Sequence, residues 1–348
     1  MISKLRLAAF GLLFALAPVA ASLSADKAQA LPAHVIAEYG VPPVVPTGAL
    51  SDLLDRDARA VFVESMQNST WGSDQEFALM NIGTSGDLRL AWLISDLMRF
   101  ISSRGINVQL ADAASELLGK DIPIDNAWGE LTDILIAWDI PAPPNYLEMK
   151  RAIFTSVLPD WAPLFEEGQI DWRHVSWGGV PIDARPFDQT DERCNCIPAA
   201  DNPEVSTAAE ATWLKDSDVV FGVVVNGEAR AYPRRIMEVR EMVNDTLGGR
   251  DLGIPYCTLC GAAQAYFTDE VPAGVERPVL RTSGLLIRSN KVMFDLETFS
   301  VFDTFLGNAV TGPLEKKGVV LDQANASTST VVSGWASFHV PHSVVTTL

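Results

Sequence analysis

The stretch VVFGVVVNGEARAY, residues 219–232, contains two strand-like runs on either side of an Asn-Gly pair. Residues 219–225 are mostly β-branched or aromatic, and residues 228–232 alternate between polar and apolar side chains. Asn226-Gly227 is the strongest short signal for a two-residue hairpin, because both central positions of such a turn need a positive φ. The sequence therefore predicts a β-hairpin here and a β-rich C-terminal half.

Beyond this hairpin, further short apolar runs are bounded by turn residues, as is typical of strands. We predict strands at residues 253–257, 263–267, 279–282, 291–295 and 319–321, and a short helix at about residues 235–244.

The N-terminal half has a different periodicity. Between residues 51 and 165, apolar side chains recur every three or four positions, which is typical of amphipathic helices. The four stripes are Leu53, Leu54, Ala58 and Val61; Leu88, Trp92, Leu93, Leu97 and Phe100; Trp128, Leu131, Ile134, Leu135 and Trp138; and Leu147, Ala152, Ile153 and Val157. Ser51-Asp52 and Ser85-Gly86-Asp87 are expected to begin helices, and DIPAPPN at 139–145 breaks the pattern.

These patterns predict an α+β protein. We expect a helical domain at residues 31–170, arranged as an array of helical hairpins, then a loop-rich linker at 171–200 and a β-rich domain at 201–348. Two domains agree with the length, because 348 residues exceed what one hydrophobic core usually serves.

The charge balance excludes some classes of partner. The chain carries 26 Lys and Arg against 44 Asp and Glu, a net charge of −18. Nucleic acids and anionic membranes need clustered Lys and Arg, and no such cluster is present in the sequence. Neither a G-x-G-x-x-G nor a P-loop motif for nucleotides occurs.

Residues 1–30 have the pattern of a secretory signal peptide. Lys4 and Arg6 precede an apolar run at 7–19, and Ala28-Gln29-Ala30 is a cleavage pattern, with an earlier alternative at 19–21. The run is too short to span a bilayer, and no later stretch reaches eighteen uninterrupted apolar residues. We therefore expect a periplasmic or secreted protein with no membrane span after cleavage.

Four cysteines in an oxidising compartment are expected to form disulfides. They are Cys194 and Cys196, separated by one residue, and Cys257 and Cys260, separated by two. A bridge within the first pair is expected to be too tight, so we predict one from that pair to Cys257 or Cys260 as the structural alternative.

The stretch GIPYCTLCGAAQAYF, residues 253–267, allows three kinds of site. As a metal site, Cys257 and Cys260 would join Cys194 and Cys196 around zinc or copper, since the glycine after Cys260 permits the required turn. As a reactive thiol, the pair needs a nearby cation, for which Arg240, Arg281 and Arg288 are candidates. As a structural pair, it needs no metal and no cation.

Other polar residues accompany the cysteines. Glu241 and Asp245 are four apart, so on the expected helix they would share a face with room for a metal or a shared proton, near Asn244. A second polar group follows a predicted strand and comprises Ser283, Gly284, Arg288, Ser289 and Asn290.

These residues belong to blocks that resemble the DUF3179 family of exported proteins, over roughly residues 197–314. The blocks are N-G-x-x-x-A-Y-P, E-x-V-N-D, Y-C-x-L-C-G, S-G-x-x-x-x-S-N and a final G-P-L, in that order. The family commonly has Trp-His before E-x-V-N-D, where this chain has Val239-Arg240. The resemblance implies an exported domain of uncharacterised function and no particular reaction.

Three functions follow from these observations. The first is thiol redox or thiol-dependent chemistry at Cys257 and Cys260, with Glu241, Asn244, Asp245, Arg288 and Asn290 as the accompanying catalytic candidates. The second is a protein that binds zinc or copper through the four cysteines, and the third is a module with structural disulfides that binds a protein partner through its helical array. For a site, we predict that Cys257, Cys260, Asn244, Arg288 and Asn290 converge within about 10 Å. Whether the protein is an enzyme stays open.

Overall fold

The computed structural model describes residues 31–189, 193–329 and 343–346. A short helix, α1 (Ala33–Tyr39), belongs to an N-terminal unit that ends at Gly40, and the chain from Val41 onward forms a second compact unit. The signal peptide predicted for residues 1–30 lies outside the described residues. In the described part, no helix is both long and apolar enough to cross a membrane.

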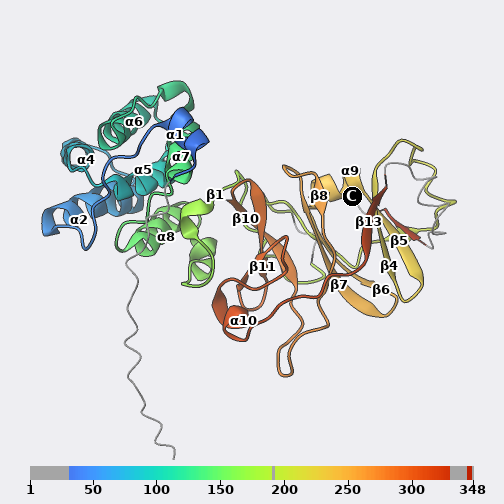
Figure 1. The fold of residues 1–348 in the computed structure, drawn as a ribbon. Coiled ribbons are helices and arrows are strands. Elements are labelled where there is room, and N and C mark those ends of the chain that lie inside the picture. Colours follow the sequence, from blue (N-terminus) through green and yellow to red (C-terminus); the bar gives the residue numbers. More distant parts are fainter. Residues whose placement is uncertain (1–30, 190–192, 330–342, 347–348) are drawn as a thin grey trace, which may run out of the picture. The chain divides into compact units, whose positions relative to one another are not determined.

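Helices fill the first half of the second unit, as expected (Figure 1). They are α2 (Asp52–Ala58), a π-helical turn (Arg59–Glu64), α3 (Ser65–Asn68), α4 (Ser73–Thr84), α5 (Ala91–Met98), α6 (Arg104–Leu118), α7 (Ala127–Ala137) and α8 (Tyr146–Val157), with 3₁₀ turns at Leu88–Leu90, Ile124–Asn126, Pro159–Leu164 and Trp172–His174. Ser51 caps α2, since its side chain accepts a hydrogen bond from the Leu54 amide at 3.3 Å. Asp87 caps the turn before α5 in the same way.

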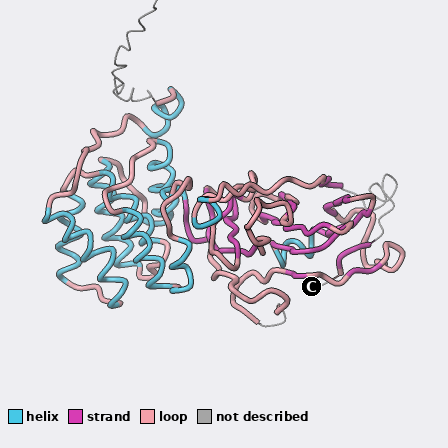
Figure 2. The backbone as a smooth tube through the Cα atoms, turned by 90° about the horizontal axis from the view of Figure 1, so that it is seen from below, coloured by secondary structure: helices cyan, strands magenta, loops and turns pink. Residues whose placement is uncertain are grey.

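Strands fill the second half of the chain, so the α+β prediction is confirmed. Figure 2 shows the helices in cyan and the strands in magenta. The strands are β1 (Val175–Trp177), β2 (Ala200–Asp201), β3 (Val205–Ser206), β4 (Val220–Val225), β5 (Glu228–Pro233), β6 (Met242–Leu247), β7 (Arg250–Cys257), β8 (Ala262–Ala263), β9 (Tyr266–Phe267), β10 (Leu280–Ile287), β11 (Asn290–Asp295), β12 (Val301–Asp303), β13 (Ala326–Ser329) and β14 (Ser343–Val345); the helices here are α9 (Arg234–Arg240) and α10 (Gly312–Lys316).

The described strands form three sheets. Their orders are β1-β10-β11-β12, β13-β4-β5-β14-β3, and β2-β6-β7-β8 with β9 also paired to β7. Most pairs are antiparallel, while β14 runs parallel to β5 and β2 parallel to β6. The β4–β5 hairpin turns at Asn226 and Gly227, whose φ values are 49° and 84°, as the Asn-Gly pair predicts.

Three local predictions in this half need correction, and the first is the strand expected at 263–267, which is divided into β8 and β9. The helix expected at about 235–244 ends at Arg240, and residues 242–247 form strand β6 instead. The helix ends at Glu241, which has a left-handed φ of 50°. Glu241 and Asp245 therefore do not share the helical face that their spacing of four residues predicts. The strand expected at 319–321 is reduced to a single bridge between Val320 and Asn308.

The helical array contacts the strand part through β1 and β10. The segment expected to be a linker supplies β1, which pairs with β10. The Trp161 indole donates to the carbonyl of Ser283 on β10 at 2.8 Å, and the buried Lys150 ammonium donates to the carbonyl of Val175 at 2.6 Å. These buried hydrogen bonds fix β1 and β10 against the helices.

Candidate functional site

The two cysteines of the C-x-x-C stretch lie side by side with unequal exposure. Cys257 ends β7 and is buried, whereas Cys260 lies in the following turn and is exposed. Their Sγ atoms are 2.8 Å apart. Gly261 completes the turn with a φ of 63°, the left-handed conformation that the sequence predicts for it. One accessible sulfur is thus backed by one shielded sulfur.

A second hairpin, β10–β11, approaches both sulfurs. Arg288 and Ser289 form its two-residue turn, with φ values of 46° and 72°. The Ser289 carbonyl accepts weak hydrogen bonds from both thiols, at 3.6 Å from Cys257 Sγ and 3.7 Å from Cys260 Sγ. Asn290 Oδ1 lies 3.7 Å from Cys260 Sγ. The hairpin therefore places polar oxygens over the exposed sulfur.

A buried cation, Lys291, completes the site. Its ammonium donates to the main-chain carbonyl of Glu241 at 2.5 Å and to Thr282 Oγ1 at 2.8 Å, and lies 3.9 Å from Glu241 Oε2. Burial lowers the pKa of Lys291 to about 8, and negative charge on Glu241 and then on Cys257 acts in the opposite direction. Lys291 thus interacts electrostatically with the buried thiol and is partly neutral near neutral pH.

The thiol of Cys260 is protonated at neutral pH. Loss of hydration, the hydrogen bond with Cys257, and negative charge on Cys257 and Glu241 together raise its pKa to about 11. A reaction at this sulfur therefore needs a group that can remove its proton or share the charge.

Comparison with known proteins covers this half of the chain. Residues 194–346 match the family model DUF3179, a protein of unknown function. The resemblance noted in the sequence blocks is thus confirmed, and its range extends beyond 197–314 on both sides. No curated protein and no solved structure gives a significant match.

Two of the candidate residues in the DUF3179 region lie in other networks. Asn244 Nδ2 donates to Asp201 Oδ1 at 2.8 Å and to the Leu280 carbonyl at 3.1 Å, while its Oδ1 accepts from the Leu280 amide. Asp245 accepts from Arg230 at 2.6 Å and from the Tyr232 hydroxyl at 2.7 Å. Neither has a hydrogen bond to the cysteines, so both side chains serve to tie strands together.

The arginines expected to support a thiolate also have other partners. Arg281 is fully buried, and its guanidinium donates to both carboxylate oxygens of Asp201, at 2.8 Å and 2.5 Å. Arg288 contacts His174 Nε2 at 3.1 Å. Arg240 ends α9. The cation at the cysteines is instead Lys291, which the sequence analysis missed.

The remaining two cysteines form a disulfide with each other, which corrects the expected bridge between pairs. Cys194 and Cys196 are joined, with Cα atoms 5.1 Å apart, within the usual range for a disulfide. The intervening loop bends enough to bring the two Cβ atoms together, so spacing in sequence did not exclude the bond. Cys257 and Cys260 are free of any bridge to them.

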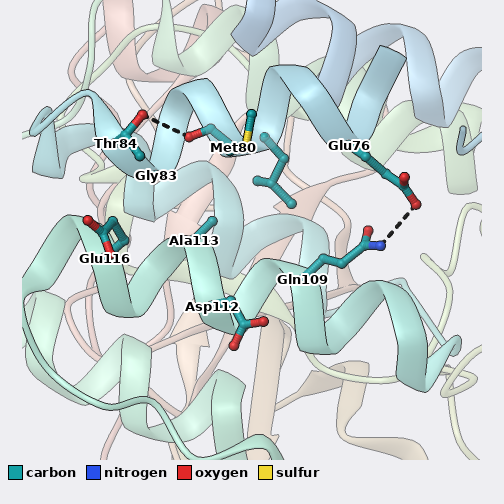
Figure 3. Close-up of a pocket in the computed structure, with 9 residues that line it drawn as sticks. Glu76, Met80, Gly83, Thr84, Gln109, Asp112, Ala113 and Glu116 are labelled. Atoms are coloured by element: carbon teal, nitrogen blue, oxygen red, sulfur yellow. Dashed lines mark hydrogen bonds between the residues drawn. The ribbon is translucent and has the colours of Figure 1, made fainter. Parts of the chain in front are cut away.

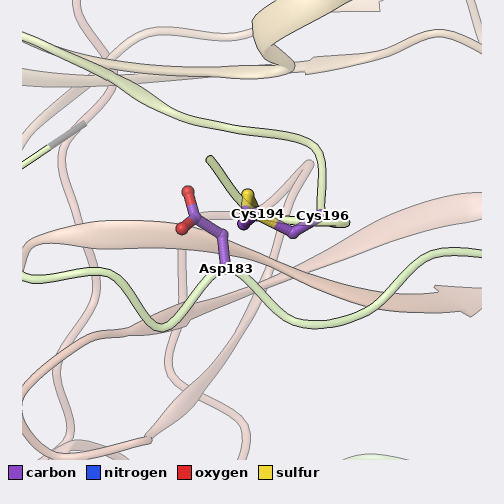
Figure 4. A group of neighbouring side chains, drawn as sticks. All are labelled: Asp183, Cys194 and Cys196. Atoms are coloured by element: carbon purple, nitrogen blue, oxygen red, sulfur yellow. A yellow bond between two sulfur atoms is a disulfide. The ribbon is translucent and has the colours of Figure 1, made fainter. Parts of the chain in front are cut away.

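A metal site would have to use different groups from those expected. Within the described residues, Asp183, Cys194 and Cys196 offer ligand atoms that all lie within 4.8 Å of one another, and Cys257 and Cys260 are not in this group (Figure 4). Thiolates are the ligands that zinc and copper select. In the disulfide form neither sulfur is a thiolate, so these residues do not fit a metal unless the bond is reduced.

The helical part has a separate hollow, between α4 and α6 (Figure 3). Its volume is about 380 Å³, and Glu76 and Gln109 are hydrogen-bonded across it at 3.0 Å. Gly83 lets the two helices approach closely, since a Cβ there would lie 3.1 Å from the Ala113 backbone. No cysteine lines this hollow.

Proposed function

We propose that the DUF3179 region is a dithiol–disulfide oxidoreductase whose redox centre is Cys257 and Cys260. The observation that supports this most directly is the 2.8 Å separation of the two sulfurs, combined with the exposure of Cys260 and the burial of Cys257. Such a pair closes to a disulfide with only a small movement, and only one sulfur is accessible to a substrate.

The first step is attack of the Cys260 thiolate on a substrate disulfide. A bond forms between Cys260 Sγ and one substrate sulfur, the substrate S–S bond breaks, and the second substrate sulfur leaves as a thiolate that takes up the proton lost by Cys260. Asn290 and Ser289 border the attacking sulfur and position the incoming disulfide.

The second step resolves the mixed disulfide. The Cys257 thiolate attacks Cys260 Sγ, the Cys257–Cys260 disulfide forms, and the remaining substrate sulfur leaves. The substrate gains two electrons and the protein dithiol loses two. The leaving substrate thiolate takes up the proton that Cys257 loses, and the positive charge of Lys291 interacts favourably with the Cys257 thiolate. The reverse sequence oxidises a substrate dithiol.

This mechanism is tested with the chromogenic disulfide 5,5′-dithiobis(2-nitrobenzoate). The reduced protein, with Cys194 and Cys196 replaced by serine, is expected to release two equivalents of thionitrobenzoate and to keep no adduct. With the further change Cys257→Ser it should release one equivalent and retain a mixed disulfide on Cys260, seen by mass spectrometry.

Two stable adducts in the Cys257-containing protein would overturn the mechanism, because they would show that the thiols do not resolve each other. Metal analysis of the unmodified protein addresses the alternative function. Zinc or copper that copurifies and is lost on Cys194→Ser would favour a metal site at Asp183 over a structural disulfide.

We also propose that this chemistry takes place outside the cytosol. Lys4, Arg6 and the apolar run that follows support export, as does the cleavage pattern at residues 28–30. Mass spectrometry of the exported fraction should find a mature chain that starts at Leu31 or Ser22. An uncleaved Met1 form as the main species would contradict export.

A further inference from the structure

A cavity of about 400 Å³ adjoins the cysteine site. Its walls come from α5, α7, β1 and the β10–β11 turn, and Leu259 of the C-x-x-C turn lines it as well. Ser289 also lines it, and the Ser289 carbonyl is within 3.7 Å of both sulfurs. A molecule in this cavity would therefore lie next to the exposed thiol of Cys260.

One wall carries a partly buried guanidinium, that of Arg99. It lies over the Trp128 ring, 4.3 Å from the centroid, and donates to the Trp177 carbonyl. Among the described residues, no carboxylate pairs with it, and its buried Nε has no hydrogen-bond partner. Burial alone lowers the pKa of Arg99, so no nearby negative charge offsets the cost of burying it.

A second guanidinium, that of Arg288, lies at the exposed turn beside Ser289. It contacts His174 Nε2 and, within the described part of the chain, forms no ion pair. Burial lowers the pKa of His174 against the opposing charge of Asp171, and the charge of Arg288 acts in the same direction as burial, so the neutral imidazole accepts from Arg288 without cancelling its charge.

The other charged groups of the cavity are already engaged. Asp96 pairs with Lys150 at 2.5 Å, and Arg173 pairs with Asp171 at 2.6 Å. Asp133 lines an exposed part of the wall. Arg99 and Arg288 are therefore the two cations of this cavity without a carboxylate partner in the described structure.

We propose that this cavity binds an organic anion, a disulfide or thiol that carries carboxylates, and holds its sulfur beside Cys260. This inference rests on the proposed function and adds the chemical class of its substrate. Guanidinium groups recognise carboxylates through paired charge-assisted hydrogen bonds, and Trp128 and Trp177, which also line the cavity, supply aromatic surface for the chain between the charges.

Three small disulfides that differ in charge test the proposal. They are 3,3′-dithiodipropionate with two negative charges, 2-hydroxyethyl disulfide with none, and cystamine with two positive charges. For each disulfide, the rate of reduction by the reduced protein is divided by the rate of reduction of the same disulfide by dithiothreitol. This ratio corrects for differences in the intrinsic reactivity of the three disulfides. We expect the anionic disulfide to be preferred over cystamine by about tenfold or more.

The global charge of the protein makes this result diagnostic. A net charge of −18 repels anions and attracts cations, so without a specific site cystamine would react fastest. Arg288→Met should lower the rate with the anionic disulfide about tenfold relative to the neutral one. Arg104→Met, which removes an exposed guanidinium outside the cavity, should leave all three rates unchanged.

A binding measurement with a ligand that has no sulfur tests the anion site independently of the proposed oxidoreductase function. Octanedioate has the chain length and charges of dithiodipropionate but no sulfur, and calorimetric titration should show saturable binding that Arg288→Met and Arg99→Met weaken. No binding, or equal corrected rates for the three disulfides, would overturn the anion site. Absence of exchange with all three disulfides, with octanedioate still bound, would overturn the oxidoreductase alone.

Discussion

The ammonium of Lys291 and the carboxylate of Glu241 face each other at 3.9 Å, and the same ammonium donates to the Glu241 main-chain carbonyl. Glu241 has a left-handed conformation at the end of α9, and its carbonyl also accepts from the Tyr256 amide on β7. At the end of α9, the Glu241 carbonyl thus accepts hydrogen bonds from both the Tyr256 amide and the buried Lys291 ammonium. Lys291 is consequently fixed next to the strand that carries Cys257.

The buried lysine should give the protein a distinctive pH dependence of stability. The pKa of Lys291 is about 8 in the folded state against 10.5 for an ordinary lysine, so between these values the unfolded chain binds more protons. Stability therefore rises with pH over this window, by up to about 3 kcal/mol from this group. Urea unfolding at pH 7 and pH 10 should show this gain in the parent and not in Lys291→Met. Equal pH dependence in both proteins would show that Lys291 is not buried in its charged form.

Alkylation should reveal the coupling between the two thiols. The pKa of Cys260 is raised to about 11, so its rate of reaction with iodoacetamide should keep increasing from pH 8 to pH 11. Cys257→Ser removes the hydrogen bond and the charge of Cys257, and should lower the pKa of Cys260 and speed alkylation at pH 8 several-fold. Thiol mass mapping in the Cys194→Ser/Cys196→Ser background measures the rate, and Thr258→Ala is the neighbouring control. A slower reaction in Cys257→Ser would contradict the coupling.

Asn244 should prove important for stability and unimportant for thiol reactivity. Asn244→Ala leaves the buried Leu280 amide without its partner and removes one of two donors from both Asp201 Oδ1 and the Leu280 carbonyl, to which Arg281 still donates, and this should cost about 1–3 kcal/mol. Denaturant unfolding measures the loss, with the exposed Asn68→Ala as a control. The alkylation rate of Cys260 should stay at the parent value, and a large change in that rate would return Asn244 to the site.

The disulfide between Cys194 and Cys196 should make a small contribution to stability. It closes a very short loop, for which chain-entropy reasoning gives about 1–2 kcal/mol, whereas a bridge from Cys196 to Cys257 would close about sixty residues and contribute roughly 4 kcal/mol. Cys196→Ser should therefore lower the melting temperature slightly. Peptide mapping without reduction should find both cysteines bonded within one peptide, and a peptide cross-linked to Cys257 would refute this pairing.

Local chemistry was sufficient to predict part of the architecture. Asn226-Gly227 predicted its hairpin because a two-residue turn has a strict backbone requirement, and Gly261 predicted the turn after Cys260 for the same reason. The helix expected across residues 235–244 failed because Glu241 adopts a left-handed conformation, which strand pairing of β6 with β7 and β2 imposes from outside the segment. Helical spacing of two carboxylates carries no information about such tertiary pairing.

The site was predictable in its sulfur atoms and not in its cation. The C-x-x-C-G motif can be read directly from the sequence. Lys291 lies in the strand NKVMFD, and the burial of its ammonium depends on hydrogen bonds to Thr282 and Glu241 on other elements. The apolar residues on both sides of β11 were the available signal, because a lysine within a strand buried along its whole length must find partners there. Arg281 was chosen for its charge, which Asp201 already balances.

Adjacent residues of β10 connect the helical array with the proposed cysteine site. The carbonyl of Ser283 accepts the Trp161 indole, and the hydroxyl of its neighbour Thr282 accepts the Lys291 ammonium. One peptide unit therefore separates the residue that anchors the helices from the residue that holds the Lys291 ammonium. Through this strand the helical array supports the position of Lys291, so under the proposed function we expect a partner or ligand that displaces Trp161 to alter the redox potential of the cysteines without contacting them.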